Sequence, residues 1–238
     1  GLQLDAASLL ARAEWLAVAD VQGAASGARI LSAAALTEAE IVDRFGHRIE
    51  SKQILTYDKS TDRVDARVQR RLGAIVLSEG RVEKPDPQAV ASALMAAVQD
   101  MGIDALPWPS SARALRERAH FAGVTSLSDD ALAETMKQWL LPLLGKVNRL
   151  RDLAPSGLAN ALDNMLGWDT RTRIDQIAPT SFKSPAGTEH HIDYAAEAGP
   201  TVELRVQALF GLDSHPLVGA NRLPLVLSLT SPAGRPIQ

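Results

Sequence analysis

The 238-residue sequence contains no cysteine, which excludes disulfide bonds, cysteine-ligated zinc and thiol nucleophiles. Aromatic residues make up only 4% of the chain and hydrophobic residues 46%, so we expect a core of aliphatic side chains. No apolar run approaches the roughly 20 residues that span a bilayer. The first residues also lack the basic start and apolar stretch of a signal peptide. These absences predict a cytoplasmic protein with no membrane partner.

Catalytic motifs are also missing. A GxxxxGK[ST] loop cradles phosphates with its glycines and reaches them with its lysine, and no segment fits this pattern. The adjacent His190 and His191 would point to opposite faces of a strand, so they cannot share a metal ion. No nucleophile-elbow motif accompanies the serines and histidines. We therefore predict no catalytic residues, no metal site and no ATP hydrolysis by this chain alone.

Hydrophobic periodicity and turn residues predict an α+β fold with three regions. Residues 1–84 combine several short strands with one helix, which is typical of a small OB-like β-barrel. Residues 85–167 follow a helical pattern. Residues 168–238 are predicted to form a β-rich domain with a hairpin around Ala186 and Gly187. The chain ends straight after a strand-like segment, so we expect this last domain to be truncated.

Local signals predict where individual helices begin and end. Thr37 and Glu40 have the spacing of a capping box. Asp86 precedes Pro87 and is expected to cap the first helix of the second region. Gly167 is expected to end the last helix of that region. Three tryptophans have apolar neighbours and are expected to pack in the core: Trp15, Trp139 and Trp168.

Basic residues cluster between Arg44 and Arg71, although the net charge of the whole chain is −3. This segment contains eight lysines and arginines against four acidic residues, a local balance of +4. Alternation along a strand places three of the arginines on one face, where they could follow phosphates. A tyrosine in the same segment could stack on a base. The predicted nucleic-acid-binding residues are Arg48, Lys52, Tyr57, Arg63, Arg67 and Arg71.

Two features keep other interpretations open. The same strand face could be a solvated surface whose charges form local ion pairs. A second basic face, formed by Arg113, Arg116 and His120 at helical spacing, could also meet a phosphate or simply face solvent.

An ordered series of short motifs resembles the C-terminal domain of the HrpB family of bacterial DEAH-box ATP-dependent helicases. Upstream segments, including Trp15–Asp20 and Leu106–Trp108, resemble the part of the family that precedes this domain. Each motif is short, and their order along the chain makes the match specific. The C-terminal motifs are Asp175–Thr180, Ser184–Gly187, Ile192–Tyr194, Val206–Gly211, Leu225–Leu229 and Ser231–Pro236.

The resemblance implies two RecA-like motor domains and a helical accessory domain before residue 1, with ATP and magnesium bound by the motor and no cofactor in this fragment. Residues 1–84 stand where related helicases have an oligonucleotide-binding barrel. The expected partners are single-stranded nucleic acid, RNA in the first instance, and the helicase core of the same parent chain. The alternative is a protein-docking or structural module without nucleic-acid contact. One departure is that only two clear strands precede the helix after Thr37, where such barrels have three.

Overall fold

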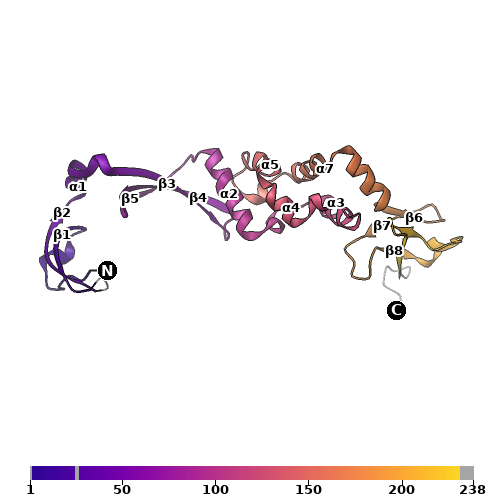
Figure 1. Cartoon of the computed structure of the whole chain (residues 1–238), viewed down its shortest axis with the longest axis horizontal. Helices are drawn as coiled ribbons and strands as arrows, with labels where there is room; N and C mark the ends of the chain where they lie inside the picture. The colour runs from indigo at the N-terminus through magenta and orange to yellow at the C-terminus, as the bar shows by residue number, and fades with distance from the viewer. Residues whose placement is uncertain (1, 25–26, 231–238) are drawn as a thin grey trace. The chain divides into compact units, whose positions relative to one another are not determined.

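The structure is a computed structural model that describes residues 2–24 and 27–230 (Figure 1). Contacts group residues 1–55 and 65–84 in a first compact unit, and residues 56–64 and 85–238 in a second. The mixture of helices and sheets confirms the α+β class. The division into domains at residues 84 and 167 stays a prediction. The Ser231–Pro236 motif lies outside the described residues.

The first five strands of the chain form two separate sheets. One is an antiparallel pair of β1 and β2, and the other has the order β3-β4-β5. No closed barrel is present among the described residues, so the predicted OB-like barrel is not confirmed. Before β1, Gln3 makes only an isolated bridge with Arg29. The elements are η1 (Leu9–Arg12), β1 (Trp15–Gln22), β2 (Arg29–Leu36), α1 (Glu38–Phe45), η2 (Gly46–Arg48), β3 (Ile49–Asp58), β4 (Arg63–Leu72) and β5 (Ile75–Arg81).

Helix α1 begins with the predicted capping box. The Thr37 hydroxyl accepts a hydrogen bond from the Glu40 amide, and the Glu40 carboxylate accepts one from the Thr37 amide. Ile41 on the next turn is buried. The first unit has few other buried apolar side chains, namely Ala28, Ala66 and Leu77. The apolar core of the first unit is therefore small over the residues that the structure describes.

Helices make up most of the second unit (Figure 1). Asp86 caps α2 as predicted, with its carboxylate accepting from the Ala89 amide. The apolar stripe that starts after Ser128 forms three short helices rather than one. The elements are α2 (Pro87–Met101), η3 (Ile103–Ala105), α3 (Ser110–Phe121), η4 (Thr125–Leu127), α4 (Asp129–Glu134), α5 (Met136–Trp139), α6 (Leu141–Leu144), η5 (Leu150–Asp152) and α7 (Pro155–Ile177).

Gly167 interrupts the helical geometry where the sequence predicts a helix end. It adopts a left-handed φ of 68°, and a second helical segment follows it within α7. A glycine tolerates this conformation at little cost, so the two segments meet at a kink. Trp168 follows the kink and is 80% exposed. The prediction that Trp168 packs in the core was therefore wrong, because the kink moves it off the apolar stripe.

The core of the helical part is aliphatic, as the composition predicts, with two tryptophans added. Trp108 and Trp139 are buried, and their rings stack with centroids 5.7 Å apart. Each indole nitrogen donates to a backbone carbonyl, which removes the cost of burying it. The core prediction for Trp139 is thus confirmed.

The C-terminal part of the second unit is a four-stranded sheet with the order β11-β8-β7-β6. The β6–β7 hairpin turns at Ala186 and Gly187, as predicted. Strand β11 lies parallel to β8 and is one edge of the sheet. The sheet covers a small core centred on Ile192, Val202 and Leu225. The elements are β6 (Ser181–Lys183), β7 (Glu189–Asp193), β8 (Thr201–Arg205), η6 (Val206–Leu209), β9 (Leu217–Val218), β10 (Leu223–Pro224) and β11 (Val226–Thr230).

Candidate functional site

Arg67 on β4 is held by two carboxylates. Its Nε lies 2.7 Å from an oxygen of Asp65, and its Nη1 lies 2.6 Å from an oxygen of Glu79 on β5. Hydrogen bonds from Arg67, and then from Gln69, lower the pKa of Glu79. The lowered pKa keeps Glu79 ionised near neutral pH, and the ion pairs with Asp65 and Glu79 offset the charge of Arg67. The predicted phosphate-binding role does not suit this side chain, since a phosphate would have to displace two charged partners.

Arg71 is also engaged within the protein. It is half-buried, and its Nη2 donates to the backbone oxygen of Ala74 at 3.4 Å. Its Nε is buried without a hydrogen-bond partner. The adjacent Arg70, which the sequence did not single out, forms an ion pair with Glu38 of α1 at 3.1 Å. This end of β4 is thus committed to contacts inside the first unit.

Tyr57 is engaged through its hydroxyl group within the second unit. It is half-buried, and its hydroxyl donates to Asp62 at 2.7 Å. Burial, together with the hydrogen bond to this carboxylate, raises the pKa of Tyr57 to about 12. Burial alone would raise the pKa of Asp62, but hydrogen bonds from Arg151, Tyr57 and two backbone amides lower it overall. Asp62 is therefore an ionised anchor, a role that the sequence did not indicate.

Three of the six predicted residues remain available to a ligand. Arg48, Lys52 and Arg63 are exposed, and none of them forms an ion pair within the described ranges 2–24 and 27–230. Arg48, Lys52, Arg67 and Arg71 belong to the first unit, whereas Tyr57 and Arg63 belong to the second. The structure thus divides the predicted set between the two units.

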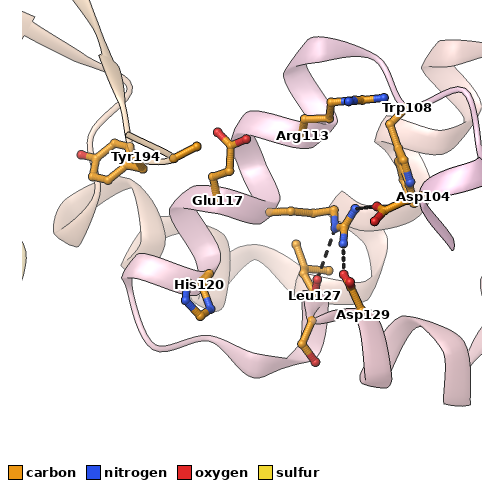
Figure 2. A pocket seen from close by; sticks show the side chains of 11 residues that line it. Asp104, Trp108, Arg113, Glu117, His120, Leu127, Asp129 and Tyr194 are labelled. Carbon is orange, nitrogen blue, oxygen red and sulfur yellow. Dashed lines mark hydrogen bonds and ion pairs between the residues drawn. The ribbon is translucent and has the colours of Figure 1, made fainter. Parts of the chain in front are cut away.

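The second basic face borders a cleft of about 640 Å³ beside α3 (Figure 2). Arg116 is only 15% exposed and is used internally, with ion pairs to Asp104 and Asp129 and its guanidinium 5.3 Å from the centre of the Trp108 ring. Arg113 and His120 are exposed. The cleft is lined by Asp104, Trp108, Arg113, Arg116, Glu117, His120, Leu127, Ser128, Asp129, Tyr194 and Ala195.

The charges of this cleft do not favour an anion. Burial raises the pKa of Glu117, and the negative charge of Asp193 raises it further. Arg113 lies along α3 on the same side as Glu117 (Figure 2), so acidic and basic groups alternate there. A phosphate would meet carboxylates as well as cations, and the cleft is therefore a poor second phosphate site.

Within residues 2–24 and 27–230, neither a cluster of metal-ligating side chains nor a membrane-spanning helix is found. No group of three or more His, Asp or Glu residues there could hold a metal ion. No helix in that part is both long and apolar enough to cross a bilayer. His190 is half-buried and hydrogen-bonded to Thr188, whereas His191 is exposed.

Comparison with known proteins identifies relatives over the whole chain. Residues 139–238 match the family model HrpB_C, described as ATP-dependent helicase C-terminal. Over 247 residues, the chain is 31% identical to the ATP-dependent RNA helicase HrpB of Escherichia coli strain K12. This match covers 100% of the chain and 30% of the relative, so the chain spans under a third of the relative's length.

Two solved structures share the fold. The crystal structure of the E. coli DExH-box NTPase HrpB matches with a TM-score of 0.61 and 30% identity, over 100% of this chain and 30% of that one. The crystal structure of the Escherichia coli DEAH/RHA helicase HrpB matches with a TM-score of 0.59 and 26% identity, over 100% and 31% of the two chains. The sequence relative and both solved structures are thus HrpB proteins of E. coli, each similar to the full length of this chain.

Proposed function

We propose that this chain, a C-terminal region of the HrpB family, is an accessory part of an ATP-dependent helicase and contacts single-stranded nucleic acid, RNA in the first instance. ATP and magnesium would be bound by motor domains outside this chain, because its sequence contains no phosphate-binding loop of the GxxxxGK[ST] type. The proposed role here is to guide the strand that the motor moves.

The availability of three cations carries this proposal. Arg48, Lys52 and Arg63 are exposed, whereas Asp65 on β4 is paired with Arg67 and Asp62 at the hairpin is paired with Arg151. Exposed cations that keep their charge attract the phosphate backbone without reading the base sequence. Binding through them should therefore be independent of sequence and sensitive to salt.

The test is fluorescence-anisotropy titration of the chain with a labelled single-stranded RNA over a series of salt concentrations. The double substitution Arg48→Ala and Lys52→Ala should weaken binding and reduce the salt slope by about 1.4, at roughly 0.7 per single-strand phosphate contact. The matched control is Ser51→Ala with Gln53→Ala, which changes two exposed uncharged residues on β3, the strand that carries Lys52 and follows Arg48. Absence of binding by the unsubstituted chain at low salt would contradict the proposal.

A second function, docking onto the helicase core of the parent, is favoured by exposed apolar residues on the β1–β2 pair. Val18, Val21 and Leu31 are 38%, 44% and 53% exposed. A two-stranded sheet is marginally stable alone in water, so a protein surface against it would stabilise it. Replacing Val21 and Leu31 with threonine should lower the fluorescence of a dye that binds apolar surfaces. Unchanged dye binding in this variant would argue against the docking role.

A further inference from the structure

The tip of the β3–β4 hairpin is attached to a loop far along the chain. One carboxylate oxygen of Asp62 accepts from the backbone amide of Leu150 at 3.0 Å, across 88 residues. The other accepts from the amide of Arg151 at 3.2 Å and from its guanidinium Nε at 2.7 Å. Arg151 also donates to the backbone oxygen of Thr61 at 3.1 Å. These four bonds form a joint between the tip and the loop.

The tip has a defined shape before it meets the loop. Asp58 accepts hydrogen bonds from the amide and hydroxyl of Ser60 and from the hydroxyl of Thr61, which closes the turn. Asp62 adopts a left-handed φ of 52°, a conformation that aspartate tolerates better than most residues. Because Asp62 is also held by Tyr57, its carboxylate has little freedom to leave the loop.

Both segments that the joint connects carry cations close to it in the sequence. The tip contributes Lys59 and Arg63, which are exposed, and the loop contributes exposed Lys146 and half-buried Arg149. With Arg151, these segments carry five basic residues against three acids, Asp58, Asp62 and Asp152, a balance of +2. Residues 56–64 and 85–238 belong to the same compact unit, so the two groups of cations are part of one body.

We propose that the tip and the loop form one composite surface that binds the phosphates of single-stranded nucleic acid, with the Asp62 joint holding the two sets of cations together. This surface rests on the proposed function and extends it to the loop of residues 145–152. Neither residues 56–64 nor residues 145–152 include an exposed large hydrophobic side chain. A protein partner would be expected to need an apolar centre, whereas a phosphate backbone needs only cations.

The decisive test is a substitution that changes RNA affinity in opposite directions under two hypotheses. In one, affinity depends only on the net charge of the chain, and in the other it depends on the composite surface. Asp62→Asn removes one negative charge, so charge alone predicts tighter binding of a labelled single-stranded RNA. The composite surface predicts several-fold weaker binding, since the joint opens while every cation remains. The matched control is Asp152→Asn, which removes the same charge beside the joint without breaking any hydrogen bond of the joint. Its RNA binding should be unchanged or slightly tighter.

A second variant covers the case in which Asp62→Asn unfolds the tip. The double substitution Lys146→Ala and Arg149→Ala keeps the joint and should reduce the salt slope by about 1.4, for two single-strand phosphate contacts at roughly 0.7 each. Its control is Lys137→Ala with Arg173→Ala, an equal charge change at exposed positions of the same unit. Melting temperatures measured alongside show which variants remain folded.

The outcomes separate this surface from the proposed function. If the unsubstituted chain binds RNA and only Arg48→Ala with Lys52→Ala weakens binding, the proposed function stands and the composite surface is overturned. If the loop variant and Asp62→Asn both weaken binding and their controls do not, the composite surface is supported. If the unsubstituted chain binds no RNA at low salt, both are overturned.

Discussion

Arg118 on α3 donates from its Nε to the backbone oxygen of Ala178, at 2.6 Å and across 60 residues. Its guanidinium also pairs with Asp175 near the end of α7. Arg118 is only 3% exposed and the Ala178 residue is fully buried. Pro179, which follows Ala178, also accepts a hydrogen bond on its backbone oxygen. The donor is the hydroxyl of Tyr194, on the loop after β7, at 2.8 Å. The helical part and the C-terminal sheet are thus held by buried polar contacts at one place.

Replacing Arg118 with alanine should therefore destabilise the second unit. The buried carbonyl of Ala178 would lose its donor and a cavity would remain, which together cost about 2–3 kcal/mol. Urea denaturation followed by tryptophan fluorescence measures the change in the free energy of unfolding. The control Arg113→Ala removes an exposed arginine from the same helix and should change this free energy by less than about 0.5 kcal/mol. Equal effects of the two substitutions would contradict the role assigned to Arg118.

Gly219→Ala should also destabilise the junction between α3 and the C-terminal sheet. Gly219 has a φ of 81°, and an added Cβ would lie 3.0 Å from the ring of Phe121. The control is Gly187→Ala, since Gly187 has a similar φ of 83° but open space around it. Backbone strain of about 1 kcal/mol is expected in both variants, and only Gly219→Ala should lose more. Thermal melting of the two variants compares them directly, and equal losses would show that Phe121 can move aside.

The two tyrosines should ionise at a higher pH in the folded protein than in the unfolded chain. The pKa of Tyr57 is raised to about 12 by burial and by its hydrogen bond to Asp62, and that of Tyr194 is raised to about 12 by burial. Since the neutral forms are favoured in the folded protein, their contribution to stability is present below pH 10 and is lost as pH rises through about 12. In a pH titration, phenolate absorbance should appear at higher pH in the native chain than in the denatured chain. Coinciding curves would show that both hydroxyls are solvated.

Two arginines on the same strand should differ in their effect on nucleic-acid binding. Arg63→Ala should weaken binding of single-stranded RNA and lower the salt slope, because this side chain is exposed and forms no ion pair among the described residues. Arg67→Ala should have a smaller effect, since Asp65 and Glu79 already offset its charge. Anisotropy titrations at two salt concentrations compare them. A larger loss with Arg67→Ala would mean that the ligand displaces the carboxylates.

Local chemistry is where the sequence was most informative. The capping box at Thr37 and Glu40, the N-cap Asp86 and the turn at Gly187 were all predicted, because each depends on residues only a few positions apart. The aliphatic core was predicted from composition, because the chain has few aromatic and many hydrophobic residues. These features establish the elements and their approximate ends.

Long-range partners explain most of what the sequence did not reveal. The strand pattern placed Arg67 on an exposed face correctly, but Glu79, which offsets its charge, comes from another strand. Asp62 appeared to be a turn residue, whereas its partners Leu150 and Arg151 lie almost a hundred positions later. No local signal could have found these pairs. The expected barrel likewise required a strand pairing that the first unit does not make.

The division of residues between the two units has a consequence for any attempt to separate them. The chain passes from one unit to the other three times, after residues 55, 64 and 84. A polypeptide that starts at Pro85 would therefore lack Thr56–Val64 and would leave the amides of Leu150 and Arg151 without Asp62. Cleavage after residue 55 would divide the first unit, and cleavage after residue 64 would divide both units. The two units are therefore interleaved in the sequence, and neither is a continuous segment of the chain.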